Sequence, residues 1–320
     1  MKHFDVVALG ELLIDFTQNG LSEQGNGLFE ANPGGAPGNV LAMLSRLGHR
    51  TSFIGKVGED RLGHVLAEAL EELDIDTRNL CFDVEIPTTL AMVSKTADGD
   101  RSFSFYRKPG ADIMLKKEEL QTELLADTRI FHFGSLSLTE PSIRETTREA
   151  VRMAKEAGAL ISFDPNLREP LWESLDVAAE QILWGIRQCD FLKISDNEIQ
   201  WLSGCEDFTD GVEWIREQAD IPLICVSLGK DGSRAYTKSG FVEEPAFLQE
   251  HVTDTTGAGD TFCACVLHDL LTKGPGERSE EELRSMLRFA NAAASLITTK
   301  KGALRVMPTR EEVEHRLSNA

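Results

Sequence analysis

Residues 254–260 read Asp-Thr-Thr-Gly-Ala-Gly-Asp and run directly into an apolar stretch, TFCACVLHDLL. The first amide groups of a helix have no partner within that helix. Where no bulky side chain intervenes, these amides can approach an anion closely, and the helix dipole adds a favourable field. The segment therefore predicts a phosphoryl-binding helix start formed by Gly257, Ala258 and Gly259. A tight entry into a helix, without any ligand, is the alternative.

Two carboxylates flank this segment and are expected to differ in role. Asp260 falls in the first helical turn, beside the predicted anion site. A carboxylate there can accept the proton of an attacking hydroxyl while the amides hold the transferred phosphoryl group. Asp254 lies about one turn earlier, so we assign it to holding a cation or bracing the loop.

The composition is that of an ordinary globular protein, with 41% hydrophobic and 27% charged residues in a chain of 320. This length suits one large α/β domain, or a large domain with a smaller appendage. No apolar run approaches the ~18–20 residues of a membrane span. The first residues, MKHFDVVALGELLIDF, carry acidic side chains where a secretory signal has an apolar core. We therefore expect a cytoplasmic protein.

The formal net charge is −20, which disfavours nucleic acid and anionic lipid as partners and otherwise serves solubility. The six cysteines are scattered without a CxxC pair. In a cytoplasmic chain they are expected to be small buried hydrophobic residues rather than disulfides or zinc ligands.

Apolar strands alternate with amphipathic helices along the chain. Residues 4–10 form a short β-branched run typical of a buried strand, and Val40, Leu41, Leu44 and Leu47 recur at helical spacing. Further strands are expected in TSFIGKV, RIFHFG, ALISFD, CDFLKI and PLICVSL, and further helices near residues 62–73, 141–157, 172–187, 196–218, 279–298 and 309–317. Such alternation predicts a parallel sheet with helices on both faces.

Two stretches depart from this alternation. Residues 11–36 are polar and glycine-rich, and residues 87–107 alternate on both sides of Asp98-Gly99, which predicts a β-hairpin. We expect the two stretches to form a small β-sheet that covers the carboxyl edge of the main sheet, where ligands of α/β proteins bind.

Several segments resemble one enzyme family, the ribokinase-like (phosphofructokinase-B type) carbohydrate kinases. DTTGAGDTF resembles its C-terminal signature, NPGGAPGNVLAMLSRLG (32–48) its N-terminal signature, and GKVGEDRLG (55–63) the segment that follows. FYRKPGAD (105–112) and ISFDPNLREPLW (161–172) are most similar to fructokinases. The resemblance covers nearly the whole chain.

The resemblance implies an αβα sandwich with a central, mostly parallel sheet and a small β-sheet lid. It places the nucleotide-binding core in residues 1–10, 38–86 and 112–320, and the lid in residues 11–37 and 87–111. It also implies ATP as the phosphoryl donor, Mg²⁺, and a monovalent cation such as K⁺.

The resemblance assigns Asp260 as the catalytic base and the three small residues before it as the anion hole. Asp15 matches the lid carboxylate that holds sugar hydroxyls, and Gly34, Gly35 and Asn39 match the sugar loop. Paired acceptors and donors of this kind suit a neutral polyol. A solvated acid at a strand end is the alternative for Asp15, and a helix cap the alternative for Asn39.

Two arginines and one loop are further candidates. Arg107 follows the aromatic hairpin strand and is expected to point from the lid toward the sugar. Arg168 follows a strand at the carboxyl edge of the sheet, where a guanidinium can clamp phosphates. Asp164 and Asn166 shape the same loop, and we consider both substrate contact and a plain turn role for each.

The resemblance also implies nucleotide and cation sites. SLGKDGS (227–233) resembles a turn that lines adenosine with backbone, and Glu198 is expected to order Mg²⁺ through water. Ser195 departs from the usual Asn, which puts direct nucleotide contact there in doubt. The implied nucleotide residues are Ser195, Glu198, Ser227, Gly229, Gly232 and Asn291. The implied ligands of the monovalent cation are Asp254 and Thr256, with carbonyls at Ile297, Lys300 and Gly302.

We therefore expect ATP-dependent phosphorylation of a ketohexose, with the 6-hydroxyl of fructose as the first choice. Alternatives are a kinase for 2-keto-3-deoxygluconate, ribose or a nucleoside, and a sugar or nucleotide sensor without turnover. The apolar faces of the lid hairpin, with Leu90, Met92, Phe103 and Phe105, also suggest a homodimer formed through the lid.

Overall fold

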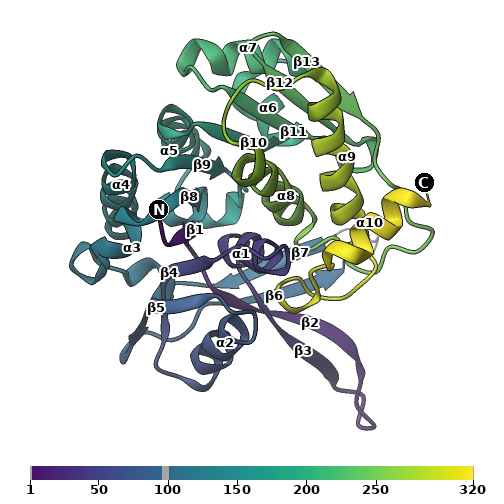
Figure 1. The fold of residues 1–320 in the computed structure, drawn as a ribbon. Coiled ribbons are helices and arrows are strands. Elements are labelled where there is room, and N and C mark those ends of the chain that lie inside the picture. Colours follow the sequence, from purple (N-terminus) through teal and green to yellow (C-terminus); the bar gives the residue numbers. More distant parts are fainter. Residues whose placement is uncertain (1, 96–100, 320) are drawn as a thin grey trace.

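The computed structural model of the protein describes residues 2–95 and 101–319. Within them the chain forms a sheet of nine strands and a separate sheet of four (Figure 1). The strands are β1 Phe4–Leu9, β2 Leu13–Leu21, β3 Gly27–Gly34, β4 Thr51–Gly58, β5 Asp76–Asp83, β6 Leu90–Lys95, β7 Arg101–Tyr106, β8 Thr128–Gly134, β9 Leu160–Asp164, β10 Phe191–Ser195, β11 Leu223–Ser227, β12 Ser233–Thr237 and β13 Gly240–Glu244.

The large sheet has the strand order β13-β12-β11-β10-β9-β8-β1-β4-β5. All neighbours from β11 to β5 run parallel, while β12 and β13 pair antiparallel at one edge. The helices are α1 Ala36–Arg46, α2 Arg61–Glu71, α3 Thr122–Ala126, α4 Pro141–Glu156, α5 Leu175–Gln188, α6 Asp196–Ser203, α7 Phe208–Gln218, α8 Ala258–Lys273, α9 Glu280–Ile297 and α10 Arg310–Ser318. This is the mostly parallel sheet that the strand–helix alternation predicts.

Helices cover both faces of the large sheet, and each face has its own apolar core. In β1, Val6 and Ala8 face a cluster that includes α1, α2, α8, α9 and α10, whereas Val7 and Leu9 face a cluster that includes α3 to α7. The strand is buried on both faces, which is why its sequence is a continuous apolar run rather than an alternating one. The result is the three-layer sandwich expected from the sequence.

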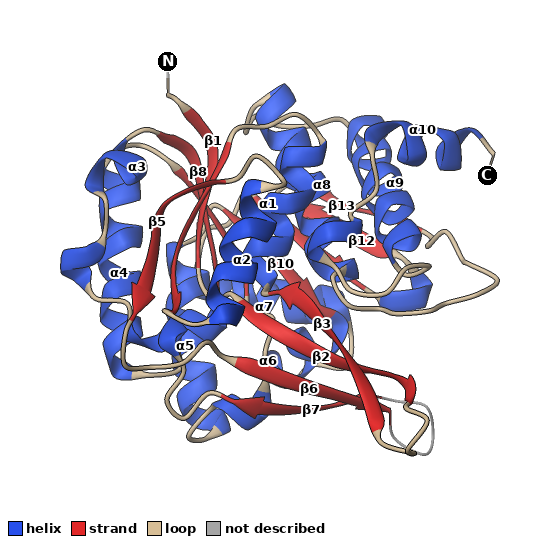
Figure 2. Ribbon diagram, turned by 90° about the horizontal axis from the view of Figure 1, so that it is seen from below, coloured by secondary structure: helices blue, strands red, loops and turns tan. Residues whose placement is uncertain are grey.

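The four-stranded sheet lies apart from the sandwich, at the end where α1 and α8 begin (Figure 2). Its order is β3-β2-β6-β7, with β2 and β6 parallel and the other pairs antiparallel. The bases of β2 and β3 are buried, whereas their outer halves are exposed. The two departures from the alternation therefore form one small sheet, as expected. The turn of the predicted hairpin at Asp98-Gly99 lies outside the described residues.

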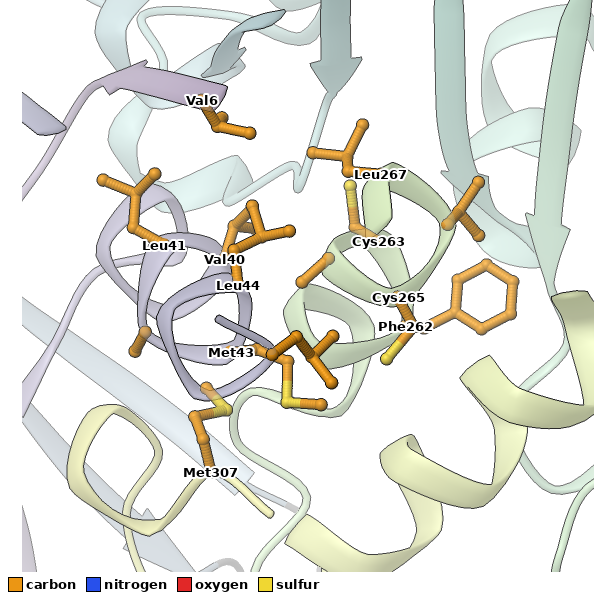
Figure 3. Close-up of a cluster of buried hydrophobic side chains, with 14 of the residues drawn as sticks. Val6, Val40, Leu41, Met43, Leu44, Phe262, Cys263, Cys265, Leu267 and Met307 are labelled. Carbon is orange, nitrogen blue, oxygen red and sulfur yellow. The ribbon is translucent and has the colours of Figure 1, made fainter. Parts of the chain in front are cut away.

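Helices α1 and α8 pack against each other over the same face of the large sheet, as Figure 3 shows for Val40, Leu44, Cys263 and Leu267. All four side chains are essentially inaccessible to solvent. Burial of each such aliphatic side chain contributes roughly 1.5–3 kcal/mol. This packing fixes the start of α1 next to the start of α8, which matters for the site below.

The observed elements differ from the predicted ones in a few places. The helix expected at 196–218 is two helices, because Gly204 adopts φ 71° and ends α6 in the left-handed region. The helix expected from 172 begins at Leu175, where the Ser174 side chain caps it. All six cysteines are free, and four of them are buried. No helix in the described residues is both long and apolar enough to cross a membrane.

Candidate active site

A cleft of about 840 Å³ lies between the carboxyl edge of the large sheet and the lid. Residues from both sheets and from the starts of α1 and α8 line it. It contains Asp15, Gly35, Asn39, Asn166, Arg168 and Asp260. These six come from four separate stretches of the sequence, and the fold brings the stretches to one cavity.

A second cleft, of about 430 Å³, adjoins the first along the ends of β10 and β11. It contains Ser195, Glu198, Ser227 and Gly229 from the predicted nucleotide site. The residues that line both clefts are Asn166, Arg168, Lys193, Asn197 and Gly259. The two clefts therefore meet at the predicted anion hole.

The start of α8 has the geometry of an anion site. Gly257 is the N-cap residue with φ 79°, and no side chain caps the helix. A Cβ on Gly257 would lie 2.7 Å from the Cβ of Ala303, so both its conformation and its surroundings require glycine. The helix dipole of the 16-residue α8 points its positive end at the cleft. The small residues thus leave the first amides of α8 open to an anion.

Asp260 lies on this first turn and lines the larger cleft, with only 7% of its surface exposed. Its Oδ2 accepts a hydrogen bond of 2.8 Å from Nδ2 of Asn39. Burial raises the pKa of Asp260, and the Asn39 hydrogen bond together with the charges of Lys193 and Arg168 opposes that rise. A carboxylate with a raised pKa is better matched to accepting a proton near neutral pH.

Asn39 does not cap a helix, because the N-cap residue of α1 is Gly35 and no side chain caps that helix. Its Oδ1 is buried and has no hydrogen-bond partner among the described residues. A buried acceptor of this kind is costly unless a donor reaches it. A sugar hydroxyl in the cleft is such a donor, so this atom supports the assignment of Asn39 to substrate.

The sugar loop is held in a conformation that only glycine permits. Gly35 has φ 123°, and a Cβ there would overlap the carbonyl oxygen of Glu11. The Glu11 side chain in turn accepts a hydrogen bond of 2.8 Å from the amide of Ala36. A Cβ on Gly34 would lie 2.7 Å from Oδ2 of Asp15, so glycine there keeps the space beside this carboxylate open. Asp15 itself lines the cleft.

The side chain of Arg107 was expected to point from the lid toward the sugar, and this expectation is wrong. Arg107 is 5% exposed and forms a salt bridge of 2.7 Å with Asp112. Its remaining guanidinium bonds go to Thr139 and to the carbonyl of Leu136. The side chain therefore points into the protein and ties the end of β7 to the core, because a buried guanidinium needs a carboxylate and further acceptors.

The residues at the end of β9 and in the loop after it have different roles. Asp164 is 3% exposed and its carboxylate contacts the ammonium of Lys193 at 3.1 Å, so it supports the site from behind instead of lining either cleft. Asn166, with φ 44°, and Arg168 line both clefts. The electrostatic effect of Arg168 reaches Asp260. The predicted substrate contact of Asp164 is thus corrected to a supporting role.

Ser195 and Glu198 form a capping box at the start of α6. The Glu198 carboxylate accepts from the amide and hydroxyl of Ser195 and, at 2.7 Å, from the amide of Leu167. Burial raises the pKa of Glu198, but Lys193 and these hydrogen bonds outweigh burial and lower it overall. An ionised carboxylate held in this way fits the predicted role of ordering Mg²⁺ through water.

Two predicted nucleotide residues have structural partners. Gly232, with φ 108°, would meet the carbonyl of Glu244 if it carried a Cβ. The amide group of Asn291 bonds the hydroxyl of Ser233 and the carbonyls of Glu244 and Pro245. Asn291 is buried and lines neither cleft. Its predicted contact with the nucleotide is therefore corrected: it holds the chain after β13.

The predicted cation loop is assembled from two distant segments. The buried carboxylate of Asp254 accepts hydrogen bonds from the amides of Thr256 and Gly302, at 2.7 and 3.2 Å. The carbonyls of Ile297 and Thr298 accept from Lys300 and Asp254. These contacts bring Asp254, Thr256 and Gly302 of the predicted cation site together, and a buried carboxylate favours a cation as its partner. Among the described residues, no cluster of three or more His, Cys, Asp or Glu is placed to hold a metal ion.

Sequence reasoning missed two charged residues of the site. Lys193 lines both clefts, and Glu11 lines the larger one, where burial raises its pKa to about 7. A signal for Lys193 was available: it is a charged residue within the short apolar run FLKI (191–194). Charged side chains are rarely buried without a specific partner or function.

The chain is similar to known sugar kinases over nearly its whole length. Probable fructokinase-2 of Arabidopsis thaliana is 43% identical over 306 residues, covering 95% of this chain and 93% of that protein. The structure of fructokinase with bound ATP from Xylella fastidiosa superimposes with a TM-score of 0.90 at 32% identity, covering 98% of each chain. A double mutant of the Vibrio cholerae O395 fructokinase, solved with fructose, ADP and potassium ion, superimposes with a TM-score of 0.87 at 28% identity and 99% coverage of both chains.

The family model described as "pfkB family carbohydrate kinase" matches residues 3–310. The match takes in the lid strands, the sugar loop and the start of α8. An anion-binding helix start, a buried carboxylate beside it and a polar cleft closed by a small sheet are what such a kinase requires. The chain belongs to the pfkB family of carbohydrate kinases.

Proposed function

We propose that this protein transfers the γ-phosphoryl group of ATP to a hydroxyl of fructose, most simply the 6-hydroxyl. The observation that carries the proposal is the position of Asp260, which lies in the sugar cleft and on the first turn of the anion-binding helix. The similarity to fructokinases over nearly the whole chain supports fructose as the acceptor.

In the proposed reaction, Asp15, Asn39 and the sugar loop orient the acceptor hydroxyl toward the start of α8. Asp260 accepts the hydroxyl proton while the hydroxyl oxygen forms a bond to phosphorus and the bond to the leaving ADP oxygen breaks. The amides at 257–259 and Arg168 stabilise the negative charge that develops on the transferred group. The lid excludes water, which would otherwise compete as acceptor.

Two cations belong to the proposal. Mg²⁺ bound to the phosphates would neutralise part of their charge, with Glu198 holding its water shell. K⁺ would sit at Asp254 and Thr256, with the carbonyls at Ile297, Lys300 and Gly302, next to the amides of the anion hole. The potassium ion in the Vibrio cholerae protein supports the second assignment.

A substrate panel tests the proposal. ADP release is measured with ATP and, in turn, fructose, 2-keto-3-deoxygluconate, ribose and a nucleoside. The expected result is the highest kcat/KM with fructose. Preference for another acceptor would assign the same chemistry to a different sugar. Binding of fructose and ATP without any ADP formation would favour a sensor and contradict the proposed catalysis.

We also propose that the protein forms a homodimer through the lid and that it is located in the cytoplasm. Leu21, Leu28 and Phe29 on the β2–β3 hairpin are 64%, 48% and 46% exposed, which is apolar surface that a second copy could cover. Leu90 packs against the core instead, and the side chain of Phe103 lies outside the described residues. Free cysteines and the use of ATP favour the cytoplasm. A single-chain mass from light scattering would contradict the dimer.

A further inference from the structure

Lys193 occupies the junction through which a phosphoryl group must pass. The γ-phosphoryl group of ATP travels from the cleft with Ser195 and Ser227 to the cleft with Asp260, and the residues shared by the two clefts mark its path. Lys193 is one of two cations in that shared set, the other being Arg168.

The ammonium of Lys193 lies against the anion hole. Its Nζ would be 3.1 Å from a Cβ placed on Gly259, which is nearer than nine in ten real Cβ contacts. Gly259 is the second residue of α8, so the ammonium lies beside the first amides of that helix. Replacing the hydrogen of Gly259 with any side chain would separate the two.

The charge of Lys193 is preserved although the residue is only 5% exposed. Its Nζ contacts Asp164 at 3.2 Å to Oδ1 and 3.1 Å to Oδ2. Burial alone lowers the pKa of Lys193, but Asp164 and Glu198 outweigh burial and the pKa is raised. Replacement of such a buried pair by apolar groups is often neutral or stabilising for a fold, so stability gives little reason for its presence.

We propose that Lys193 is a further catalytic residue of the phosphoryl transfer, whose ammonium contacts an oxygen of the γ-phosphoryl group from the floor of the junction while Asp164 holds it in place. The inference rests on the phosphoryl transfer proposed above. Lys193 stays protonated throughout: the hydroxyl proton goes to Asp260, and the electron pair of the broken bond goes to the ADP oxygen. The ammonium supplies charge to the transferred group, as a fixed donor does in other anion-stabilising sites.

The test compares Lys193→Met with the double variant Lys193→Met/Asp164→Asn in the full-length protein. Methionine keeps an unbranched chain of similar length without the charge, and the double variant leaves no unpaired buried carboxylate. Both variants should lower kcat by about 10²–10³-fold, the cost of losing one such donor, with little change in the KM for sugar. Lys238→Met is the matched control, because Lys238 is exposed, pairs with Asp220 at 2.8 Å and lines neither cleft.

Calorimetric binding gives a second readout that does not depend on turnover. The single variant should bind the β,γ-imido analogue of ATP more weakly by on the order of tenfold, while its affinity for ADP stays near wild type. Full kcat in the double variant would show that Lys193 only neutralises Asp164, and equal losses for both nucleotides would show a general structural defect. Either result overturns the inference.

The two readouts separate this inference from the proposed substrate. If the wild-type protein phosphorylates none of the sugars but the variant loses affinity for the imido analogue alone, the choice of fructose is wrong and the role of Lys193 stands. If the wild type phosphorylates fructose and the single variant is equally fast, Lys193 is not catalytic and the proposed function stands.

Discussion

Asp260 combines two conditions that normally oppose each other. It is buried, which raises its pKa, yet it keeps Asn39, Lys193 and Arg168 as neighbours that favour its ionised form. A group balanced in this way is ionised enough to accept a proton and basic enough to hold it. The site achieves this by placing the carboxylate in the wall of a polar cleft and on the first turn of a helix.

Removal of this carboxylate should abolish most turnover. Asp260→Ala is expected to lower kcat by about 10²–10⁴-fold, the range typical of general acid–base catalysis, with a modest change in sugar affinity. Steady-state kinetics and calorimetry with the sugar measure the two effects. Asp210→Ala is a suitable control, since Asp210 lies in the first turn of α7 and is exposed. Near-normal turnover of the Asp260 variant would remove the base assignment.

A second prediction at the scale of single residues concerns Gly35. Gly35→Ala forces a Cβ against the carbonyl of Glu11 in a backbone conformation that side chains avoid. The strain should cost about 1–3 kcal/mol and displace the sugar loop, so the KM for sugar should rise more than kcat falls. Gly48 also has a positive φ but open surroundings, and Gly48→Ala should leave the KM unchanged. Equal effects of the two variants would show that the loop does not position the sugar.

At the scale of elements, α8 carries the predicted anion hole and Asp260 at its start. Farther along, it carries a histidine that contacts a second histidine. His268 lies in α8, and its Nδ1 is 2.6 Å from Nε2 of His49, which follows α1. Nε2 of His268 lies 3.3 Å from the guanidinium of Arg310 in α10. The three helices thus meet at a histidine whose pKa is lowered to about 4, first by burial and then by His49 and Arg310.

The lowered pKa of His268 predicts that the folding stability contributed where α1, α8 and α10 meet is sensitive to acid. Between pH ~6.5, the unperturbed value, and pH ~4, the unfolded chain binds a proton at this residue that the folded protein does not. Folding stability from this group is therefore present above pH ~6.5 and is lost as the pH falls toward 4. Urea unfolding across this range should show a weaker pH dependence for His268→Gln than for wild type. Identical pH dependence in the two proteins would exclude this role.

On the scale of the whole molecule, the site forms where two different sheets meet: the nine-stranded, mostly parallel sheet and the four-stranded lid sheet. The parallel sheet directs the ends of β9, β10 and β11 to one edge, and the lid supplies Asp15 and the sugar loop from the other side. Ligands of open α/β sheets bind at this edge. The division into core and lid at residues 11–37 and 87–111 remains a prediction about which parts move together.

The proposed division into core and lid can be tested by measuring whether the lid closes when ligands bind. With fructose and the β,γ-imido analogue of ATP together, amide hydrogen exchange in β6 and at the base of β2 should slow, because closure buries this surface. Strand β9, inside the large sheet, is the internal reference and should change little. Equal exchange in the lid with and without ligands would contradict closure. Protection by ATP analogue alone would show that the nucleotide, rather than the sugar, drives it.

Much of this arrangement could be predicted because it is local in sequence. Strand–helix alternation specifies a parallel sheet with two covered faces, and the two polar excursions specify the small sheet. The run from Gly257 to Asp260 contains both the amides and the carboxylate, so a role in phosphoryl transfer could be predicted from this stretch before any fold was known.

Contacts between distant segments were decided by the tertiary structure alone. Asn39 and Asp260 are 221 positions apart, and only the packing of α1 on α8 places their side chains at 2.8 Å. Asp164 and Lys193 lie at opposite ends of a helix crossover, and their pairing turned a predicted substrate contact into a support. Arg107 turned inward because Asp112 and two further acceptors lay within its reach. The physical reason is common to all three: a buried polar group takes whichever partner the packed core places beside it, and sequence does not state that distance.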